Sequence, residues 1–139
     1  MSLTGKHVFL LLILFCSLSF SSNAQTAKTG DDFKLIHSDK LFLNKVDNEN
    51  ILELNGKVHF FYGKTEFHSN KAIIFDTQKI ARLIGNVSVK NDTLNAVADS
   101  IAYYRLTEVM NMGGSVIITE QKTDGVFHQM TADNGTYDK

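Results

Sequence analysis

The sequence contains no proline and no tryptophan, and its only cysteine is Cys16. A chain with one cysteine forms no internal disulfide, so a disulfide-stapled scaffold is excluded. The formal net charge is −1, which is not the basic excess that nucleic-acid-binding proteins carry. We therefore expect no nucleic-acid partner. With 43% hydrophobic and 21% charged residues, the composition is still that of a globular protein.

Long hydrophobic runs are also scarce, and the main one lies at the start of the chain. Lys6 precedes an apolar stretch over residues 8–20, and small residues follow it up to Ala24. The stretch is shorter than the roughly 20 residues that a membrane-spanning helix needs. This order of a positive charge, an apolar run and small residues predicts a secretory signal peptide over residues 1–24, cleaved after Ala24. Cys16 would leave with it.

Residues 25–32 are polar and predict a short flexible leader, and residues 33–139 predict one all-β domain. Valine, isoleucine, threonine and aromatic residues alternate with polar ones along this domain, and turn-forming residues separate the runs. We expect seven strands: Phe33–Lys45, Ile51–Tyr62, Thr65–Phe75, Ile80–Lys90, Thr93–Tyr104, Glu108–Thr119 and Val126–Asp138.

A repeat organises these strands. Gly56, Gly85 and Gly114 follow each other at intervals of 29 residues, and each stands two residues before a valine. A short fixed period indicates a small unit stacked on copies of itself, which here is one antiparallel hairpin. Glycine weakens the middle of a strand unless the backbone bends there. We therefore predict that the three glycines form a crease where the sheet folds over into a trough.

The glycine strands alternate regularly between apolar and polar residues, which predicts one inward and one solvent face. The predicted inward residues are Leu54, Val58, Phe60, Leu83, Val87, Val89, Met112, Val116 and Ile118. Two interpretations of this apolar face stay open. It is either the self-filled core of a small β protein or a groove that holds the acyl chains of a lipid.

The histidines show no metal-ligand spacing along the chain, so we expect no metal and no cofactor. Those outside the predicted signal peptide are His37, His59, His68 and His128. A short polar residue recurs once per hairpin in the other strands, at Asp39, Asn70, Asp99 and Asp133. Such a residue is typical of a bulge or a local backbone hydrogen bond. Because no nucleophile motif accompanies this column, we do not expect an enzyme.

The Gly-x-Val strands alternate with strands such as VADSIAYY and TADNGTY behind the predicted signal peptide. In this combination the chain resembles the OstA-like, LptA-type family of lipopolysaccharide-transport proteins. The resemblance covers residues 51–138 well and residues 33–45 weakly. It implies a β-jellyroll folded like a taco shell and located in the periplasm. It also implies that acyl chains of lipopolysaccharide, or of a similar glycolipid, lie inside the fold.

The resemblance further implies partners. Members of this family join head to tail through the edges of their sheets and so bridge the inner and outer membranes. An open trough has unpaired edge strands that invite such pairing with another copy or a homologous jellyroll domain. Two alternatives stay open: a structural or interaction module with a filled core, and the soluble domain of a longer outer-membrane assembly protein. No closing hairpin precedes Lys139, which also leaves open a truncated member of a longer repeat protein.

Overall fold

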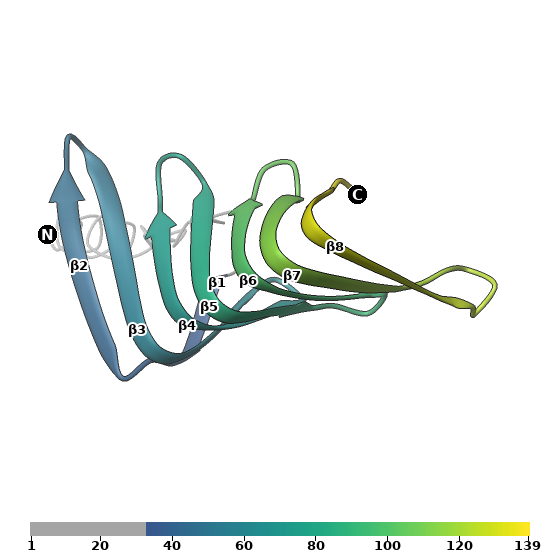
Figure 1. Cartoon of the computed structure of the whole chain (residues 1–139). Coiled ribbons are helices and arrows are strands. Elements are labelled where there is room, and N and C mark those ends of the chain that lie inside the picture. The colour runs from purple at the N-terminus through teal and green to yellow at the C-terminus, as the bar shows by residue number, and fades with distance from the viewer. Residues whose placement is uncertain (1–32) are drawn as a thin grey trace, which may run out of the picture.

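Eight antiparallel β-strands form one open sheet over residues 33–139, which are the residues that this computed structural model describes (Figure 1). The predicted signal peptide and leader lie outside the described residues. The strands are β1 (Phe33–His37), β2 (Lys40–Val46), β3 (Glu49–Tyr62), β4 (Thr65–Phe75), β5 (Ile80–Lys90), β6 (Leu94–Tyr104), β7 (Val109–Gln121) and β8 (Phe127–Tyr137). Their order is β1-β3-β4-β5-β6-β7-β8, with β2 also paired to β3. The all-β, open-sheet prediction is confirmed.

Each long strand bends near its middle, so the sheet is folded into two walls that meet along a crease (Figure 1). The walls are bounded by register shifts in the strand pairing. Wall A holds the segments 33–37, 58–62, 65–69, 87–90, 94–98, 116–121 and 127–132. Wall B holds the segments 40–46, 49–55, 71–75, 80–84, 100–104, 109–113 and 134–137.

The crease is a β-bulge that is repeated in β3, β5 and β7. In β5, Gly85 and Asn86 have φ values of 81° and 47°, and these two residues stand opposite the single residue Asn70 of β4. Two residues against one is the arrangement that bends a strand and increases its twist. The same pair of left-handed residues occurs at Gly56 and at Gly114. The three predicted crease glycines therefore stand where the walls meet.

The repeated polar column packs onto these glycines. A Cβ atom added to Gly85 would lie 2.7 Å from Nδ2 of Asn70, and one added to Gly56 or Gly114 would collide with Asp39 or Asp99. The short polar residue of one strand thus occupies the space that the missing side chain of the next strand leaves free. This contact gives the column a structural role in the bend.

The first predicted strand is wrong in one respect, because Phe33–Lys45 is two strands. The chain leaves the ladder at Ser38 and Asp39, between β1 on wall A and β2 on wall B. The backbone amide of Asp39 donates a 2.9 Å hydrogen bond to the carbonyl of Gly56 instead of continuing the regular pairing. The break is thus the crease itself, seen at the edge of the sheet. The other six predicted strands agree with the structure within two residues at each end.

The core lies between the walls, on the inner face of the sheet. Phe60 and Phe67 are both fully buried, and their rings stack with centroids 5.0 Å apart. Leu54, Leu83 and Ile101 are buried to the same degree on wall B. Burying large side chains from both walls is what holds the fold closed. No helix that is long and apolar enough to cross a membrane occurs within residues 33–139.

Candidate functional site

The inner face between wall A and wall B, here called the seam, contains all nine residues that the alternation predicts to point inward. Each of them is at most 7% exposed. The structure therefore brings these residues together on one face. They are buried by the walls themselves, so the seam is closed where they lie. Contact of these side chains with a lipid stays a prediction.

Aromatic rings fill the seam at the end formed by β3, β4 and β6. Phe67 on wall A lies with its ring centroid 5.0 Å from that of Tyr103 on wall B. Tyr62 lies 6.2 Å from the same ring, and the guanidinium of Arg105 stands 4.9 Å from the centroid of Tyr62. These ring and cation contacts run from one wall to the other. This end of the seam is held shut.

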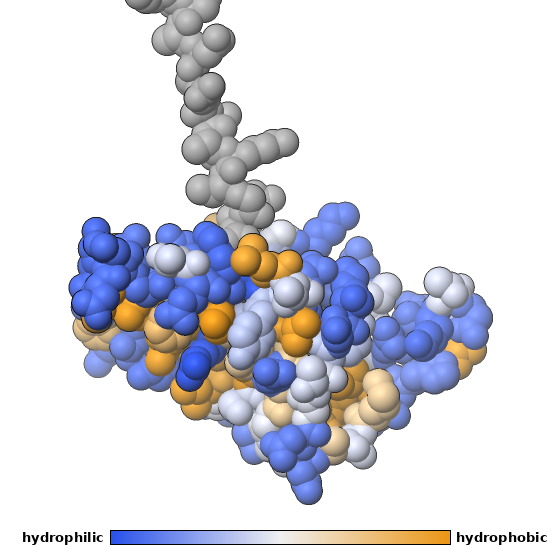
Figure 2. Space-filling model, turned by 90° about the horizontal axis from the view of Figure 1, so that it is seen from above, coloured by the Kyte–Doolittle hydropathy of each residue, from blue (hydrophilic) through white to orange (hydrophobic). Residues whose placement is uncertain are grey.

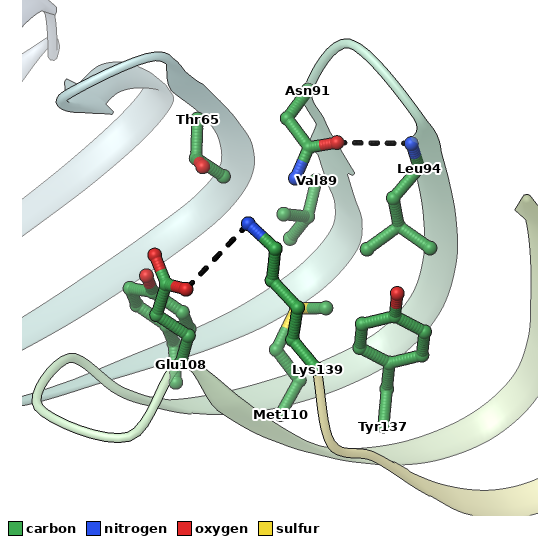
Figure 3. A pocket seen from close by; sticks show the side chains of 9 residues that line it. Thr65, Val89, Asn91, Leu94, Glu108, Met110, Tyr137 and Lys139 are labelled. Atoms are coloured by element: carbon green, nitrogen blue, oxygen red, sulfur yellow. Dashed lines mark hydrogen bonds and ion pairs between the residues drawn. The ribbon is translucent and has the colours of Figure 1, made fainter. Parts of the chain in front are cut away.

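Next to these rings, the seam opens at the rim between the walls into a small hollow of about 20 Å³ (Figure 3). Val89 and Leu94 line it from wall A, and Met110, Tyr137 and Tyr103 line it from wall B. The lining combines aliphatic side chains with polar and charged ones, and methionine adapts its shape readily to a neighbour. The hollow is therefore where the apolar seam reaches the surface, beside the ring of Tyr103.

Polar groups stand at the mouth of this hollow. Nζ of Lys139 lies 3.7 Å from Oε2 of Glu108, and both side chains line the rim (Figure 3). On the opposite wall, Oδ1 of Asn91 accepts a 2.9 Å hydrogen bond from the backbone amide of Leu94. An apolar interior with a charged and polar rim suits an amphipathic ligand whose head stays in water.

Sequence reasoning missed most of the hollow, for two different reasons. Leu94 and Tyr137 lie on strands whose inward residues the alternation did not reveal, because the bulge changes their parity. The alternation that predicted Met112 to be inward applies equally to Met110, since both lie on β7 two residues apart and both are buried. Extending the period-two pattern by one more step would have included it.

A hydrogen bond joins the walls next to the hollow. The hydroxyl of Tyr137 on wall B donates to Oε1 of Glu120 on wall A over 3.0 Å. This bond, with a second from Lys122, lowers the pKa of Glu120. Burial, and then the nearby carboxylate, raises the pKa of Tyr137. A carboxylate with a lowered pKa stabilises the fold above its ordinary pKa, and this contribution is lost as the pH falls through the lowered value.

Replacing Tyr137 with phenylalanine is expected to raise the pKa of Glu120 toward its ordinary value, because the carboxylate loses its strongest donor. The pH dependence of unfolding below about pH 5 then becomes shallower. An NMR titration of the Glu120 carboxyl carbon measures the change. Tyr104→Phe removes a hydroxyl elsewhere on wall B and serves as the control. An identical Glu120 titration in Tyr137→Phe and the unchanged protein would contradict the cross-wall bond.

Both edges of the sheet are unpaired, and both carry exposed inward residues. Every residue of β2 is exposed, and β8 is exposed over most of its length. Leu43 on β2 is 70% exposed, and Met130 on β8 is 50% exposed, although their partners Leu52 and Ile118 are inward residues. Seen from above, orange apolar patches lie between blue polar margins of the molecule (Figure 2). The apolar face thus continues to the two ends of the sheet, where no further strand of residues 33–139 covers it.

Comparison with known proteins agrees with this architecture. The family described as OstA-like protein matches residues 31–139. The chain is also similar to a solved structure of LptH, the LptA homologous periplasmic component of the conserved lipopolysaccharide transport device from Pseudomonas aeruginosa. That similarity has a TM-score of 0.63 at 12% identity, and it covers 78% of this chain and 77% of that chain. At this identity it shows a shared fold. No curated protein matches the chain. Because the family match spans well over half of the sequence, the chain belongs to the OstA-like family.

Proposed function

We propose that this protein binds lipopolysaccharide or a similar acylated glycolipid in the periplasm and passes it toward the outer membrane. The acyl chains lie in the seam, and no bond is made or broken. One observation carries this proposal: a continuous apolar inner face that leads into the hollow lined by Val89, Leu94 and Met110. Acyl chains need a long apolar surface without hydrogen-bonding groups, and little else.

Lipid binding by this fold requires the walls to separate. The hollow has a volume of about 20 Å³, far below the about 300–1,000 Å³ that ligand pockets usually offer. Further along the seam the inner side chains are already buried against one another. An acyl chain that enters at the hollow therefore replaces contacts between the walls with contacts to itself. Exchange of one apolar surface for another costs little free energy, because neither side is transferred to water.

The edges of the sheet support the transfer step of this proposal. The sheet presents β1 and β2 at one end and β8 at the other, each with one unpaired side. Antiparallel or parallel addition of a strand from another copy, or from a homologous jellyroll domain, would extend the seam beyond one molecule. The proposal includes export through the predicted signal peptide over residues 1–24. A bridge of such copies connects the two membranes.

Photo-crosslinking tests the proposal on both walls. We expect a photoreactive residue at Val89 or Met110 to capture lipopolysaccharide, because both side chains line the hollow. The matched controls are Lys90 and Asn111, which follow these residues directly and are exposed on the outer face. The measurement is the amount of lipopolysaccharide linked to the purified protein after irradiation. Equal capture at Lys90 and Val89 would contradict binding in the seam.

The aromatic end of the seam favours a second candidate, which is a structural or interaction module with a filled core. Phe60, Phe67 and Tyr103 already occupy the space between the walls there. In that case neither Val89 nor Met110 captures lipid, and adding lipopolysaccharide leaves the unfolding temperature unchanged. A ligand bound only by the folded state raises that temperature, so the two measurements separate the candidates.

A further inference from the structure

Two histidines and a glutamate converge on the outer face of the β3–β4 hairpin, on the opposite side of the sheet from the seam. Nε2 of His59 lies 2.8 Å from Oε1 of Glu66, and Nε2 of His68 lies 3.0 Å from the same oxygen. The imidazole rings stack with centroids 4.0 Å apart and an interplanar angle of 22°. One donor atom from each of the three residues lies within 4.8 Å of the other two. The cluster is partly exposed, so a solute has access to it.

Both imidazoles of this cluster share one carboxylate oxygen. His68 forms a hydrogen bond with Glu66. Nε2 of His59 is shielded from solvent and lies 2.8 Å from the same carboxylate oxygen. The lone pair of a neutral imidazole nitrogen is also a ligand for a transition metal.

We propose that His59, Glu66 and His68 bind one Zn²⁺ ion on the outer face of the hairpin. Two imidazole nitrogens and one carboxylate oxygen are a donor set that zinc favours, with a fourth position left for water. Ligand atoms of a tetrahedral zinc site lie roughly 3.4 Å apart, so a small outward movement of the Glu66 carboxylate makes room for the ion. Bound zinc joins β3 to β4 beside their turn.

The charges around the site limit its affinity for a cation. The residues that face it from neighbouring strands are Lys34 and His37 on β1, opposite Phe61 and His59, and Lys90 on β5, opposite Glu66. His37 is paired with Asp39 at 3.0 Å and is not one of the converging ligands. The lysine charges oppose a cation, and the ligand histidines bind zinc only when neutral.

Isothermal titration calorimetry of the untagged protein with ZnCl₂ at neutral pH tests this site. We expect one Zn²⁺ per chain, and at least about tenfold weaker binding in His59→Ala, His68→Ala and Glu66→Gln. Glu66→Gln keeps the size of the side chain and serves as the variant least disturbing to the fold. His37→Ala and His128→Ala remove histidines outside the cluster and should bind as the unchanged protein does. CaCl₂ should give no binding, because calcium prefers oxygen ligands.

Cobalt supplies an independent readout, because a Co²⁺ ion in a four-coordinate site absorbs strongly in the visible range. We expect this absorption in the unchanged protein and its loss in the double variant His59→Ala, His68→Ala. Circular dichroism confirms that each variant is folded before titration. Zinc affinity that is the same in the folded double variant and the unchanged protein would overturn the proposal. So would an absence of binding at roughly millimolar Zn²⁺.

Discussion

Replacing Phe67 with alanine is expected to lower the free energy of unfolding by about 3–5 kcal/mol, the usual cost of removing a buried phenylalanine ring. Phe67 is fully buried at the closed end of the seam. Its ring stacks on Phe60 within wall A and reaches Tyr103 on wall B over 5.0 Å. The truncation thus removes a contact within one wall and a contact between the two walls. Urea unfolding followed by circular dichroism measures the loss.

Phe127→Ala is the matched control for this prediction. Phe127 lies on the edge strand β8 and is 67% exposed, so removing its ring should change the free energy of unfolding by no more than about 0.5 kcal/mol. Both variants lose a phenylalanine ring, one from a buried position and the other from an exposed position. If Phe67→Ala costs as little as Phe127→Ala, the walls are not packed on each other at this point. An open trough would then describe the protein better than a closed seam.

Alternation along the glycine strands predicted their inward residues because the one extra residue of the bulge keeps the spacing of the inward residues even there. In β5 the inward residues Leu83 and Val87 are four positions apart, so an even spacing is preserved across the crease. In β6 the inward residues Ala98 and Ile101 are three positions apart, so the parity changes at Asp99. A period-two pattern read straight through β6 therefore fails halfway. The inward residues of β6 can therefore be assigned only when the position of the bulge is known.

Spacing of histidines along the chain did not predict the histidine cluster, because its members are neighbours across two strands. His59 and His68 are nine positions apart, yet they are direct cross-strand partners. The predicted two-residue connection at Gly63 and Lys64 determines that pairing, since it places Tyr62 opposite Thr65 and each earlier residue opposite a later one. A register drawn from the turn would have brought the two imidazoles together. The convergence of Glu66 on both nitrogens depends on side-chain rotamers, which no sequence pattern gives.

The sequence pattern also did not predict that the seam is closed. Alternation establishes that a face is apolar, but the same face is equally suited to line a groove or to pack against itself. The angle between the walls decides between them, and it follows from the backbone dihedral angles at each crease. Tyr62 and Tyr103 meet across this angle with ring centroids 6.2 Å apart. The crease residues therefore control how closely the walls approach and, in the proposed function, how easily lipid enters.

Replacing Gly85 with alanine is expected to lower the free energy of unfolding by about 3 kcal/mol. Two costs add: a left-handed backbone at φ 81° is strained by roughly 1–2 kcal/mol for a residue with a Cβ atom, and overpacking costs about 1–3 kcal/mol. The added Cβ would lie 2.7 Å from Nδ2 of Asn70 and 3.1 Å from its Cβ. Urea unfolding measures the change, and weaker wall-to-wall packing should accompany it.

Two further variants separate these costs. Gly63 in the β3–β4 turn also has a positive φ, 54°, but an added Cβ would have no neighbour within 4 Å. Gly63→Ala should therefore cost only the backbone strain, about 1 kcal/mol. Asn70→Ala removes the amide that Gly85→Ala would strike, so Gly85→Ala should cost less in that background than alone. Equal costs of Gly85→Ala with and without the Asn70 amide would show that the polar column does not occupy the space above the crease. The bend would then depend on backbone conformation alone.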